Sequence, residues 1–381
     1  MRLHILAALL LLLAPPLAAQ AQDAPPEAFL ADGAEGFADG EHLIVLVRRL
    51  PPEDAQATGE ALADRHGAEL SAIWPLVTLE ETCFVLRLPP AADPDAVRAE
   101  VEAEELVLLA YPIQPFELSA ETAEPLIPVQ DALRAMKLDR IGGTGAGVRV
   151  ALVDTGVAFD HPDLASRDVV FRDFVRPGPV GPVPERHGTA MAALIAADAR
   201  NGAGMAGIAP DATILALRAC WEDEAGAGRC NTFSLAIALD YAVQAGTDVL
   251  NLSLGGPSDK VLEAITGRAV EGGTLVVAAD GAAPFPSAVP GVLRVAPPGE
   301  GGAAVLHAPG LEVLSAKPAD GYDFFTGASV AAAHVSGVAA RLWSLRPEAG
   351  AERIRAALTA TPTLDACLAL GRLEGTEGDC G

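Results

Sequence analysis

From residue 142 onward the chain alternates short apolar runs with helix-length segments, and this alternation strongly constrains the fold. Six runs are short enough to be strands: 148–153, 169–173, 213–218, 249–254, 274–278 and 292–295. Five segments have the length and pattern of helices: 187–199, 232–245, 258–271, 329–345 and 347–358. Because near-continuous apolar strands are buried on both faces, the pattern predicts an α/β domain with a doubly wound, mostly parallel sheet.

Three polar residues stand out at the ends of these apolar and small-residue segments. Asp154 follows the first apolar strand, His187 begins a small-residue helix, and Ser329 lies in the first turn of another. Ligands of such sheets bind outside the carboxyl ends of the strands, where Asp154 sits. A serine in the first turn of a buried helix lies beside backbone N–H groups that can stabilise a negatively charged oxygen. The simpler alternative is that Ser329 only caps its helix.

The short motifs around these residues resemble those of the subtilisin-like serine peptidases, the subtilases of peptidase family S8. The motifs are Val153-Asp154-Thr155-Gly156, His187-Gly188-Thr189 and Gly327-Ala328-Ser329 through His334. Their chain order, Asp then His then Ser, is the order found in subtilisin. The resemblance implies a subtilisin-like fold and a serine endopeptidase that hydrolyses peptide bonds through an acyl-enzyme intermediate on Ser329.

Within that reading each residue has a chemical role. A serine hydroxyl is a poor nucleophile at neutral pH and needs a base, which the His187 imidazole would supply. Asp154 would accept the other ring N–H and stabilise the imidazolium. His334 follows Ser329 by five positions on the same helix, about 140° around it, so we expect a packed residue there and not the base.

A further resemblance marks the substrate cleft, in the sequence Asn-Leu-Ser-Leu-Gly-Gly-Pro at 251–257. In the family the edge of this strand pairs with an extended substrate through main-chain hydrogen bonds. The substrate-binding residues that the resemblance implies are Ser253, Leu254, Gly255, Ala278 and Ala279. Their side chains are mostly small and all are uncharged, so we expect an apolar residue before the scissile bond.

One departure from the family lies in the sequence Val-Val-Ala-Ala-Asp-Gly-Ala at 276–282. The family normally carries an Asn here that donates to the oxyanion, whereas this chain places Ala282 or, with a gap, Asp280 in that role. Losing one such donor lowers turnover by about 10²–10³ in subtilisin. We therefore expect a slow or narrowly specific enzyme.

Two other functions compete with the peptidase assignment. The missing Asn suggests a catalytically impaired relative that binds extended peptides without cleaving them. An α/β-hydrolase would need a Gly-x-Ser-x-Gly elbow with its His after the Ser, but position 331 is Ala and the matched His187 comes first. The hydrolase alternative is thus disfavoured.

The first 21 residues have the form of an export signal. Arg2 precedes an apolar run at 5–13, a Pro15-Pro16 break and a small-x-small site at 19–21. We expect cleavage after Ala21, with Ala19 as the alternative, and a periplasmic or secreted product. The apolar run is too short to span a bilayer comfortably, so the mature form should have no membrane span. Residues 22–40 are rich in Ala, Pro, Glu, Asp and Gly and predict a flexible segment.

Residues 41–116 predict a small α+β domain with a βαββαβ-like order. Its expected elements are strands at 42–48, near 78, at 83–88 and at 106–111, and helices at 52–66 and 93–104. The resemblance implies a ferredoxin-like, propeptide-type domain that assists folding and inhibits until it is cut away; the alternative is that it stays attached. Residues 117–142 form a linker with a first helix, 143–361 the catalytic domain and 362–381 a tail.

The net charge limits the classes of partner that we expect, and the cysteines suggest disulfides. The chain has 51 acidic and 26 basic residues, and a net charge of -25 argues against nucleic acid and anionic membrane surfaces. Export allows two local disulfides, Cys220–Cys230 and Cys367–Cys380, and leaves Cys83 as a buried thiol. We expect no cofactor and assign no metal, although structural calcium stays an open alternative. The expected partners are a peptide or protein substrate and the chain's own N-terminal domain.

Overall fold

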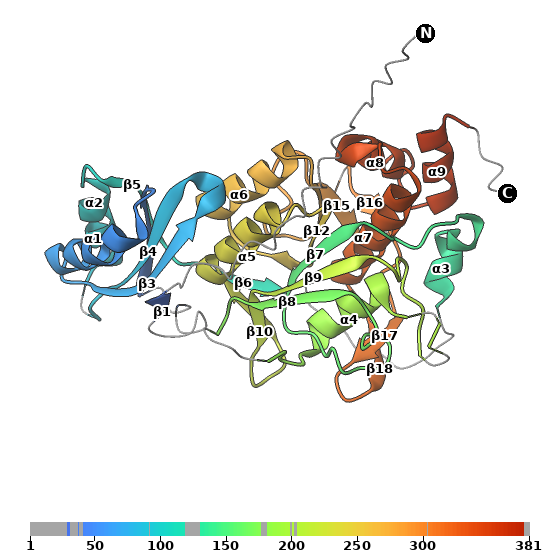
Figure 1. The fold of residues 1–381 in the computed structure, drawn as a ribbon, viewed down its shortest axis with the longest axis horizontal. Coiled ribbons are helices and arrows are strands. Elements are labelled where there is room, and N and C mark those ends of the chain that lie inside the picture. Colours follow the sequence, from blue (N-terminus) through green and yellow to red (C-terminus); the bar gives the residue numbers. More distant parts are fainter. Residues whose placement is uncertain are drawn as a thin grey trace, which may run out of the picture.

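The structure is a computed structural model that describes residues 29–30, 37, 41–90, 92–118, 130–176, 181–198, 200–201, 204–302 and 304–376. The predicted signal peptide and most of the predicted flexible segment lie outside these residues. The N-terminal domain, blue in Figure 1, lies at one end of the molecule, beside the helices α5 and α6 of the larger domain.

The N-terminal domain is a five-stranded antiparallel sheet with two helices. Its strands are β1 (Phe29–Leu30), β2 (His42–Arg48), β3 (Glu69–Leu76), β4 (Glu81–Arg87) and β5 (Val107–Pro112), in the order β1-β3-β4-β2-β5. Its helices are α1 (Pro52–Arg65) and α2 (Pro94–Glu102), which bury Leu62 and Val101 against Phe84. The order β2-α1-β3-β4-α2-β5 confirms the predicted ferredoxin-like pattern.

The strand β3 lies before the position near residue 78 where the sequence predicted a strand. It ends in Trp-Pro-Leu, and proline cannot donate to a sheet ladder, so the sequence does not read as a strand there. In the structure β1 pairs only with Ala72 and Ile73, which leaves Pro75 bonded to a neighbour on one side alone. Thr78 lies just beyond, in the short helix η2 (Val77–Leu79).

The larger domain is built on a seven-stranded parallel sheet in the order β16-β15-β14-β12-β7-β9-β8. The strands are β7 (Arg149–Asp154), β8 (Val169–Asp173), β9 (Thr213–Arg218), β12 (Val249–Leu252), β14 (Leu275–Ala279), β15 (Leu293–Ala296) and β16 (Leu306–His307). The chain places β8 and β9 on one side of β7 and then crosses to β12 on the other. The strand order therefore reverses between β7 and β12, which is where such sheets bind ligands.

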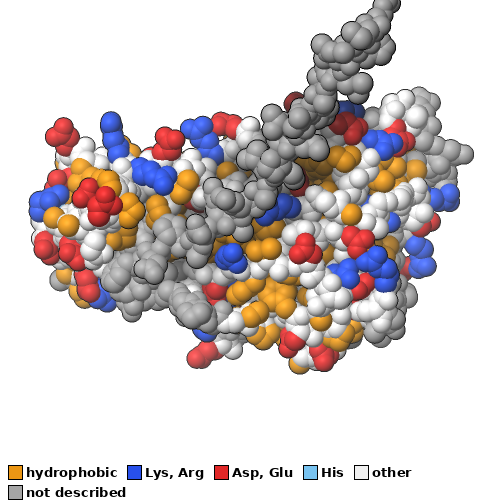
Figure 2. All heavy atoms as spheres, in the orientation of Figure 1, with side chains coloured by type: hydrophobic (Ala, Val, Ile, Leu, Met, Phe, Trp, Pro, Cys, Tyr) orange, Lys and Arg blue, Asp and Glu red, His pale blue; other side chains and the backbone are white. Residues whose placement is uncertain are grey.

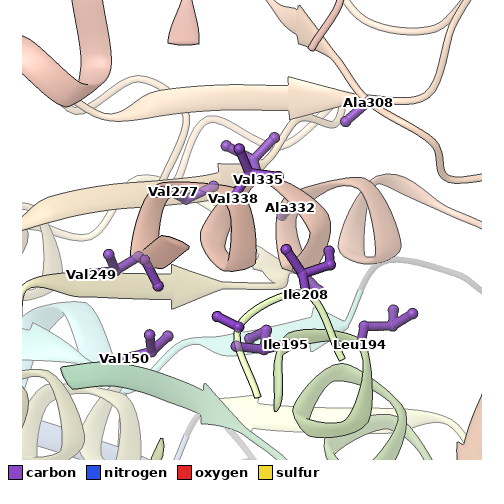
Figure 3. Packing of buried hydrophobic residues seen from close by; sticks show 14 of the residues in the cluster. Val150, Leu194, Ile195, Ile208, Val249, Val277, Ala308, Ala332, Val335 and Val338 are labelled. Atoms are coloured by element: carbon purple, nitrogen blue, oxygen red, sulfur yellow. The ribbon is translucent and has the colours of Figure 1, made fainter. Parts of the chain in front are cut away.

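Helices cover both faces of this sheet, as predicted. On one face lie α4 (Arg186–Ala196), α7 (Ala328–Leu345), α8 (Gly350–Leu358) and α9 (Ala366–Glu374), and on the other α5 (Thr232–Gln244) and α6 (Lys260–Glu271) (Figure 1). Val150 on β7, Ile195 of α4 and Val335 of α7 belong to one buried apolar cluster on the first of these faces (Figure 3). Because successive strand residues alternate between faces, Asp154 shares the face of Val150, which carries α4 and α7.

A second, four-stranded sheet lies beside the carboxyl ends of the central strands, in the order β10-β11-β6-β13. Its strands are β6 (Pro115–Leu118), β10 (Cys220–Glu222), β11 (Gly228–Asn231) and β13 (Leu254–Gly255). The predicted strand 249–254 is thus divided at Ser253 into β12 and β13. The remaining elements are α3 (Asp131–Ala135), η3 (Leu138–Arg140) and the hairpin β17 (Val313–Lys317) and β18 (Gly321–Phe325).

The predicted disulfide Cys220–Cys230 is present, and Cys83 is a buried free thiol. The predicted pair Cys367–Cys380 involves Cys380, which lies outside the described residues. None of the helices in the described ranges combines the length and apolarity needed to cross a bilayer. Figure 2 shows acidic and basic side chains intermingled on the viewed face.

Candidate active site

Asp154 and His187 form a buried hydrogen-bonded pair. The Nδ1 atom of His187 lies 2.7 Å from Oδ1 of Asp154, and the side chains are almost wholly shielded from solvent. The backbone N–H of Thr155 also donates to this Oδ1 over 2.7 Å. Because an ionised carboxylate only accepts, Nδ1 carries the hydrogen and Nε2 is left as the basic nitrogen. This is the tautomer that a general base acting through Nε2 requires.

Two motif glycines allow the Asp154 loop to pack directly on the His187 helix. A Cβ atom at Gly156 would lie 1.9 Å from the carbonyl oxygen of Val183, and one at Gly188 would lie 2.4 Å from that of Thr155. The Gly188 N–H instead donates to the Thr155 hydroxyl oxygen over 2.8 Å. The glycines are therefore needed for close backbone approach, which holds Asp154 within reach of His187.

Ser329 lies in the first turn of α7, two residues after the N-cap Gly327, whose φ of 148° favours glycine. Its Oγ atom donates to the carbonyl oxygen of Ser253 over 3.3 Å, and the Ser253 hydroxyl donates to the Ser329 carbonyl over 3.2 Å. The Asn251 amide donates to the Ser253 hydroxyl, and the Ser336 hydroxyl donates to the Asn251 amide oxygen, each over 2.8 Å. These bonds fasten α7 to the end of β12.

The strand register places Ser253 beside Asp154 at the carboxyl end of the sheet. Leu252 of β12 lies opposite Val153 of β7, so Ser253 is level with Asp154 on the neighbouring strand. Ser329, whose hydroxyl donates to the Ser253 carbonyl, therefore lies at the same carboxyl end of the sheet as the Asp154–His187 pair. The side chains of Asp154, His187 and Ser329 are all buried. The strand order reverses at this end of the sheet, between β7 and β12.

The predicted substrate-binding strand is already paired with another part of the chain. Leu254 and Gly255 of β13 lie opposite Leu118 and Glu117 of β6. On its other side β6 pairs with β11, with Glu117 opposite Arg229. Residues 115–118 thus form an extended strand between two strands of the larger domain, in the position that a bound peptide would take by strand addition.

The chain matches the model of the Subtilase family, Peptidase_S8, over residues 145–312 and 293–375, which is more than half of its length. The chain belongs to the subtilase family. It is 35% identical to thermitase of Thermoactinomyces vulgaris over 233 residues, covering 57% of this chain and 81% of thermitase. It is 31% identical to subtilisin DY of Bacillus licheniformis over 265 residues, covering 64% of this chain and 93% of the relative.

A solved structure shares this subtilase's fold at a lower sequence identity. Fervidolysin from Fervidobacterium pennivorans, described as a keratinolytic enzyme related to subtilisin, superposes with a TM-score of 0.70 at 22% identity. The match covers 91% of this chain and 64% of the fervidolysin chain. Likeness at this identity shows the fold alone. The predicted serine-peptidase family and doubly wound fold are thereby confirmed.

The structure does not favour Asp280 as an oxyanion donor. Arg294 of β15 donates from Nε to Oδ1 of Asp280 over 2.8 Å, and the Gly302 N–H approaches its Oδ2 at 3.4 Å. A carboxylate paired with a guanidinium is ionised and can only accept, so it would repel a developing oxyanion. Ala282 is exposed in the loop after β14 and has no side-chain donor. The donors that the site offers are backbone N–H groups in the first turn of α7.

Two of the predicted substrate-binding residues lie at the end of β14. Ala278 and Ala279 are buried at the end of β14, and the Ser287 hydroxyl donates to the Ala279 carbonyl over 3.3 Å. His334 is packed, as predicted. Its Nδ1 atom lies 2.8 Å from the Pro309 carbonyl oxygen, and burial lowers its pKa to about 4.

Sequence reasoning missed three charged residues beside the Asp154–His187 pair: Glu185, Arg218 and Glu222. The Glu222 carboxylate accepts the backbone N–H of His187 over 2.8 Å. Burial opposes the charge of Arg218, but its hydrogen bonds and ion pairs with Glu185 and Asp173 outweigh burial and raise its pKa. The sequence signal that could have identified Arg218 is its position at the end of an otherwise apolar strand.

Proposed function

We propose that this subtilase is an exported serine endopeptidase that uses Asp154, His187 and Ser329 as its catalytic triad. The observation that carries the proposal is the 2.7 Å bond between His187 Nδ1 and Asp154 Oδ1, at the level where Ser253 holds Ser329. This arrangement supplies a nucleophile, a base in the correct tautomer and a buried carboxylate on one face of the sheet.

In the proposed reaction Nε2 of His187 takes the proton of the Ser329 hydroxyl as Oγ attacks the scissile carbonyl carbon. The imidazolium is stabilised by Asp154 and gives this proton to the leaving amine, which leaves an acyl group on Ser329. Water then attacks the ester, with His187 again acting as base, and the acid product leaves. Each step uses side chains of this chain alone, so we propose that the chemistry needs no cofactor; calcium as a purely structural ion stays unassigned.

We propose further that the N-terminal domain inhibits the enzyme and is removed by cleavage. Two contacts support this: β6 lies between β11 and β13, and a carboxylate of the larger domain binds the N-terminal domain. Asp240 of α5 accepts the backbone N–H groups of Val77 and Thr78 over 3.1 and 2.7 Å. Since β6 ends at Leu118, we place the maturation cleavage between this residue and Gln130.

Export is proposed on the signal-like residues 1–21 and is supported by the disulfide between Cys220 and Cys230. Disulfides persist in oxidising compartments such as the periplasm and the extracellular medium.

The test compares the full chain with its Ser329→Ala variant. We expect the wild-type chain to lose its N-terminal domain and to cleave members of a peptide library, whereas the variant does neither. If the variant is processed and cleaves like the wild type, the proposed mechanism is wrong.

The second candidate, a peptide binder that does not cleave, is favoured by the missing oxyanion Asn. A serine-directed phosphonate separates the two functions. Covalent labelling of Ser329 in folded, processed protein supports the peptidase, and absence of labelling together with tight peptide binding supports the binder.

A further inference from the structure

A buried cluster of oppositely charged side chains lies next to the Asp154–His187 pair. Arg218 is at the end of β9, Asp173 at the end of β8, and Glu185 immediately before α4. The Arg218 side chain is 1% exposed, that of Asp173 4% and that of Glu185 10%. Arg218 lies opposite Asp154 in the strand register and opposite Asp173 on its other side. The cluster thus occupies the same row of the sheet as the catalytic carboxylate.

Arg218 and Glu185 face each other in a two-bond arrangement. Nε of Arg218 donates to Oε2 of Glu185 over 2.9 Å, and Nη2 donates to Oε1 over 2.8 Å. Nη1 donates to Oδ2 of Asp173 over 3.1 Å. Such paired geometry fixes the orientation of the carboxylate as well as its position.

The oriented Glu185 carboxylate binds both sides of the catalytic pair. Its Oε2 atom accepts the N–H of Gly156, two residues after Asp154, over 2.5 Å. Its Oε1 atom accepts the N–H of Glu222 over 3.2 Å. The Glu222 carboxylate in turn accepts the N–H of His187. One carboxylate therefore connects the Asp154 loop, the His187 helix and the strand β10.

We propose that Glu185, oriented by Arg218, is a positioning residue of the peptidase reaction that holds Asp154 and His187 at hydrogen-bond distance and favours the His187 imidazolium. This inference rests on the proposed triad. Stability alone is a weak reason for the cluster, because replacing a buried ion pair with apolar side chains is often neutral or stabilising. The bonds to Gly156 and Glu222 have no such apolar equivalent.

The charged groups around His187 determine whether each substitution raises or lowers the pKa of His187. The acidic groups are Asp154 on β7, Asp173 on β8, Glu222 on β10 and Glu185, and the basic groups are Arg218 on β9 and Arg186 on α4. Arg186 is directed towards Asp323, with 3.4 Å between Nη2 and Oδ2, and over the ring of Phe325. Removing the charge of Glu185 disfavours the imidazolium and lowers the pKa of His187; removing that of Arg218 raises it.

The test uses Glu185→Gln, Arg218→Met and the two changes combined, with two readouts. The first is the pKa of His187, followed by NMR titration of labelled histidines in a Ser329→Ala background. The second is kcat and KM of the processed enzyme with Ser329 intact. We expect Glu185→Gln to lower the pKa of His187 by about half a unit or more. It should reduce kcat by about tenfold or more with KM changed less than about twofold.

Arg218→Met should shift the pKa of His187 in the opposite direction, and the combined variant should return it towards the wild-type value while kcat stays low. The matched control is Asp198→Asn, which removes a similarly buried partner of Arg167 away from the site. It should leave the pKa of His187 and kcat unchanged.

The proposal is overturned if Glu185→Gln changes the melting temperature but neither the pKa of His187 nor kcat, or if the two single variants shift that pKa in the same direction. If Glu185→Gln does not fold, Glu185→Asp decides, since it keeps the charge and shortens the reach. Reduced kcat with an unchanged His187 pKa then supports positioning, and unchanged kcat refutes it. The NMR titration needs no peptidase activity, so failure of the proposed function is distinguishable from failure of this inference.

Discussion

At the scale of single residues, the site depends on positions that have little or no side chain as much as on its polar side chains. Gly156 and Gly188 let two backbone segments meet where any Cβ atom would collide with a carbonyl oxygen. Ser253 and Asn251 contribute no proton to the proposed reaction, yet their hydrogen bonds hold the α7 helix to β12. Ala282, one of the two positions that the family resemblance aligns with the oxyanion Asn, has no side-chain donor. This omission gives the first prediction.

Restoring an amide at position 282 should accelerate catalysis. Ala282→Asn is expected to raise kcat by up to about 10²-fold with little change in KM, because the new donor binds the transition-state oxyanion and not the ground state. The matched control is Ala282→Asp, which has the same shape but a charged acceptor and should not raise kcat. Steady-state kinetics on one peptide substrate measure both. Equal rates for the two variants would show that position 282 does not face the oxyanion.

His334 should make stability depend on pH. Its pKa is about 4 in the folded protein, against about 6.5 when exposed, because burial disfavours the charged ring. The unfolded chain therefore binds a proton between these values and the folded chain does not. The free energy of unfolding should fall by about 3 kcal/mol as pH drops from about 6.5 to about 4.

The measurement is urea unfolding across this pH range in the Ser329→Ala protein, which removes self-digestion. His334→Gln keeps a donor for the Pro309 carbonyl but cannot titrate, so its unfolding free energy should fall less on acidification. Carboxylates contribute to both proteins, and the difference between the two curves isolates His334. Parallel curves would contradict the assignment.

The residues of the proposed triad could be identified from the sequence, whereas the residues that support them could not. Asp154, His187 and Ser329 each sit inside a short local motif, so a few neighbouring residues identify them. Glu185 and Arg218 are 33 positions apart and meet only because α4 begins beside the end of β9. The pattern of a single segment therefore cannot predict that Glu185 pairs with Arg218.

At the scale of elements, apolar patterning predicted the long strands and helices but not the short strands of the second sheet. The strands β6, β11 and β13 have four, four and two residues, too short to show periodicity. The two cysteines predicted a local ring but not that this ring contains a strand paired with β6. In the structure Cys230 lies on β11, opposite Phe116 of β6, and its disulfide joins β11 to β10.

Breaking this disulfide should therefore weaken substrate binding. In Cys220→Ser with Cys230→Ser, we expect a several-fold higher KM for peptides with four or more residues before the scissile bond. A short ester substrate that does not reach β11 should keep its KM. The control is Cys83→Ala, which removes a buried thiol of the N-terminal domain and should leave both KM values of the processed enzyme unchanged. An equal loss on both substrates would point to general damage instead.

At the scale of the whole molecule, the two domains are joined by β6 and by a buried carboxylate. Burial raises the pKa of Asp240 in spite of its hydrogen bonds with Thr78 and Val77, so the group is desolvated where the domains meet. Its two backbone bonds orient η2 on α5. The chain order and the ferredoxin-like pattern were predictable, but the contact that joins the domains was not.

Asp240→Asn should loosen the N-terminal domain and shorten the lag before activity appears. An amide presents one acceptor oxygen and one donor, so it cannot accept both the Val77 and the Thr78 N–H groups as the carboxylate does. We expect the lag to shorten several-fold, with kcat of the processed enzyme unchanged. Progress curves of freshly folded protein measure the lag. Glu271→Gln, on the exposed end of α6, serves as control and should keep the wild-type lag.

The strand β6 also has a practical consequence for ligand discovery. As the proposed inhibitor, β6 acts as a tethered competitor whose effective concentration is about a millimolar for a short linker and does not diminish on dilution. A micromolar inhibitor screened against the uncut chain would be outcompeted and discarded as inactive. Assays, probes and crystallisation trials should accordingly begin from protein in which the backbone between Leu118 and Gln130 has been severed.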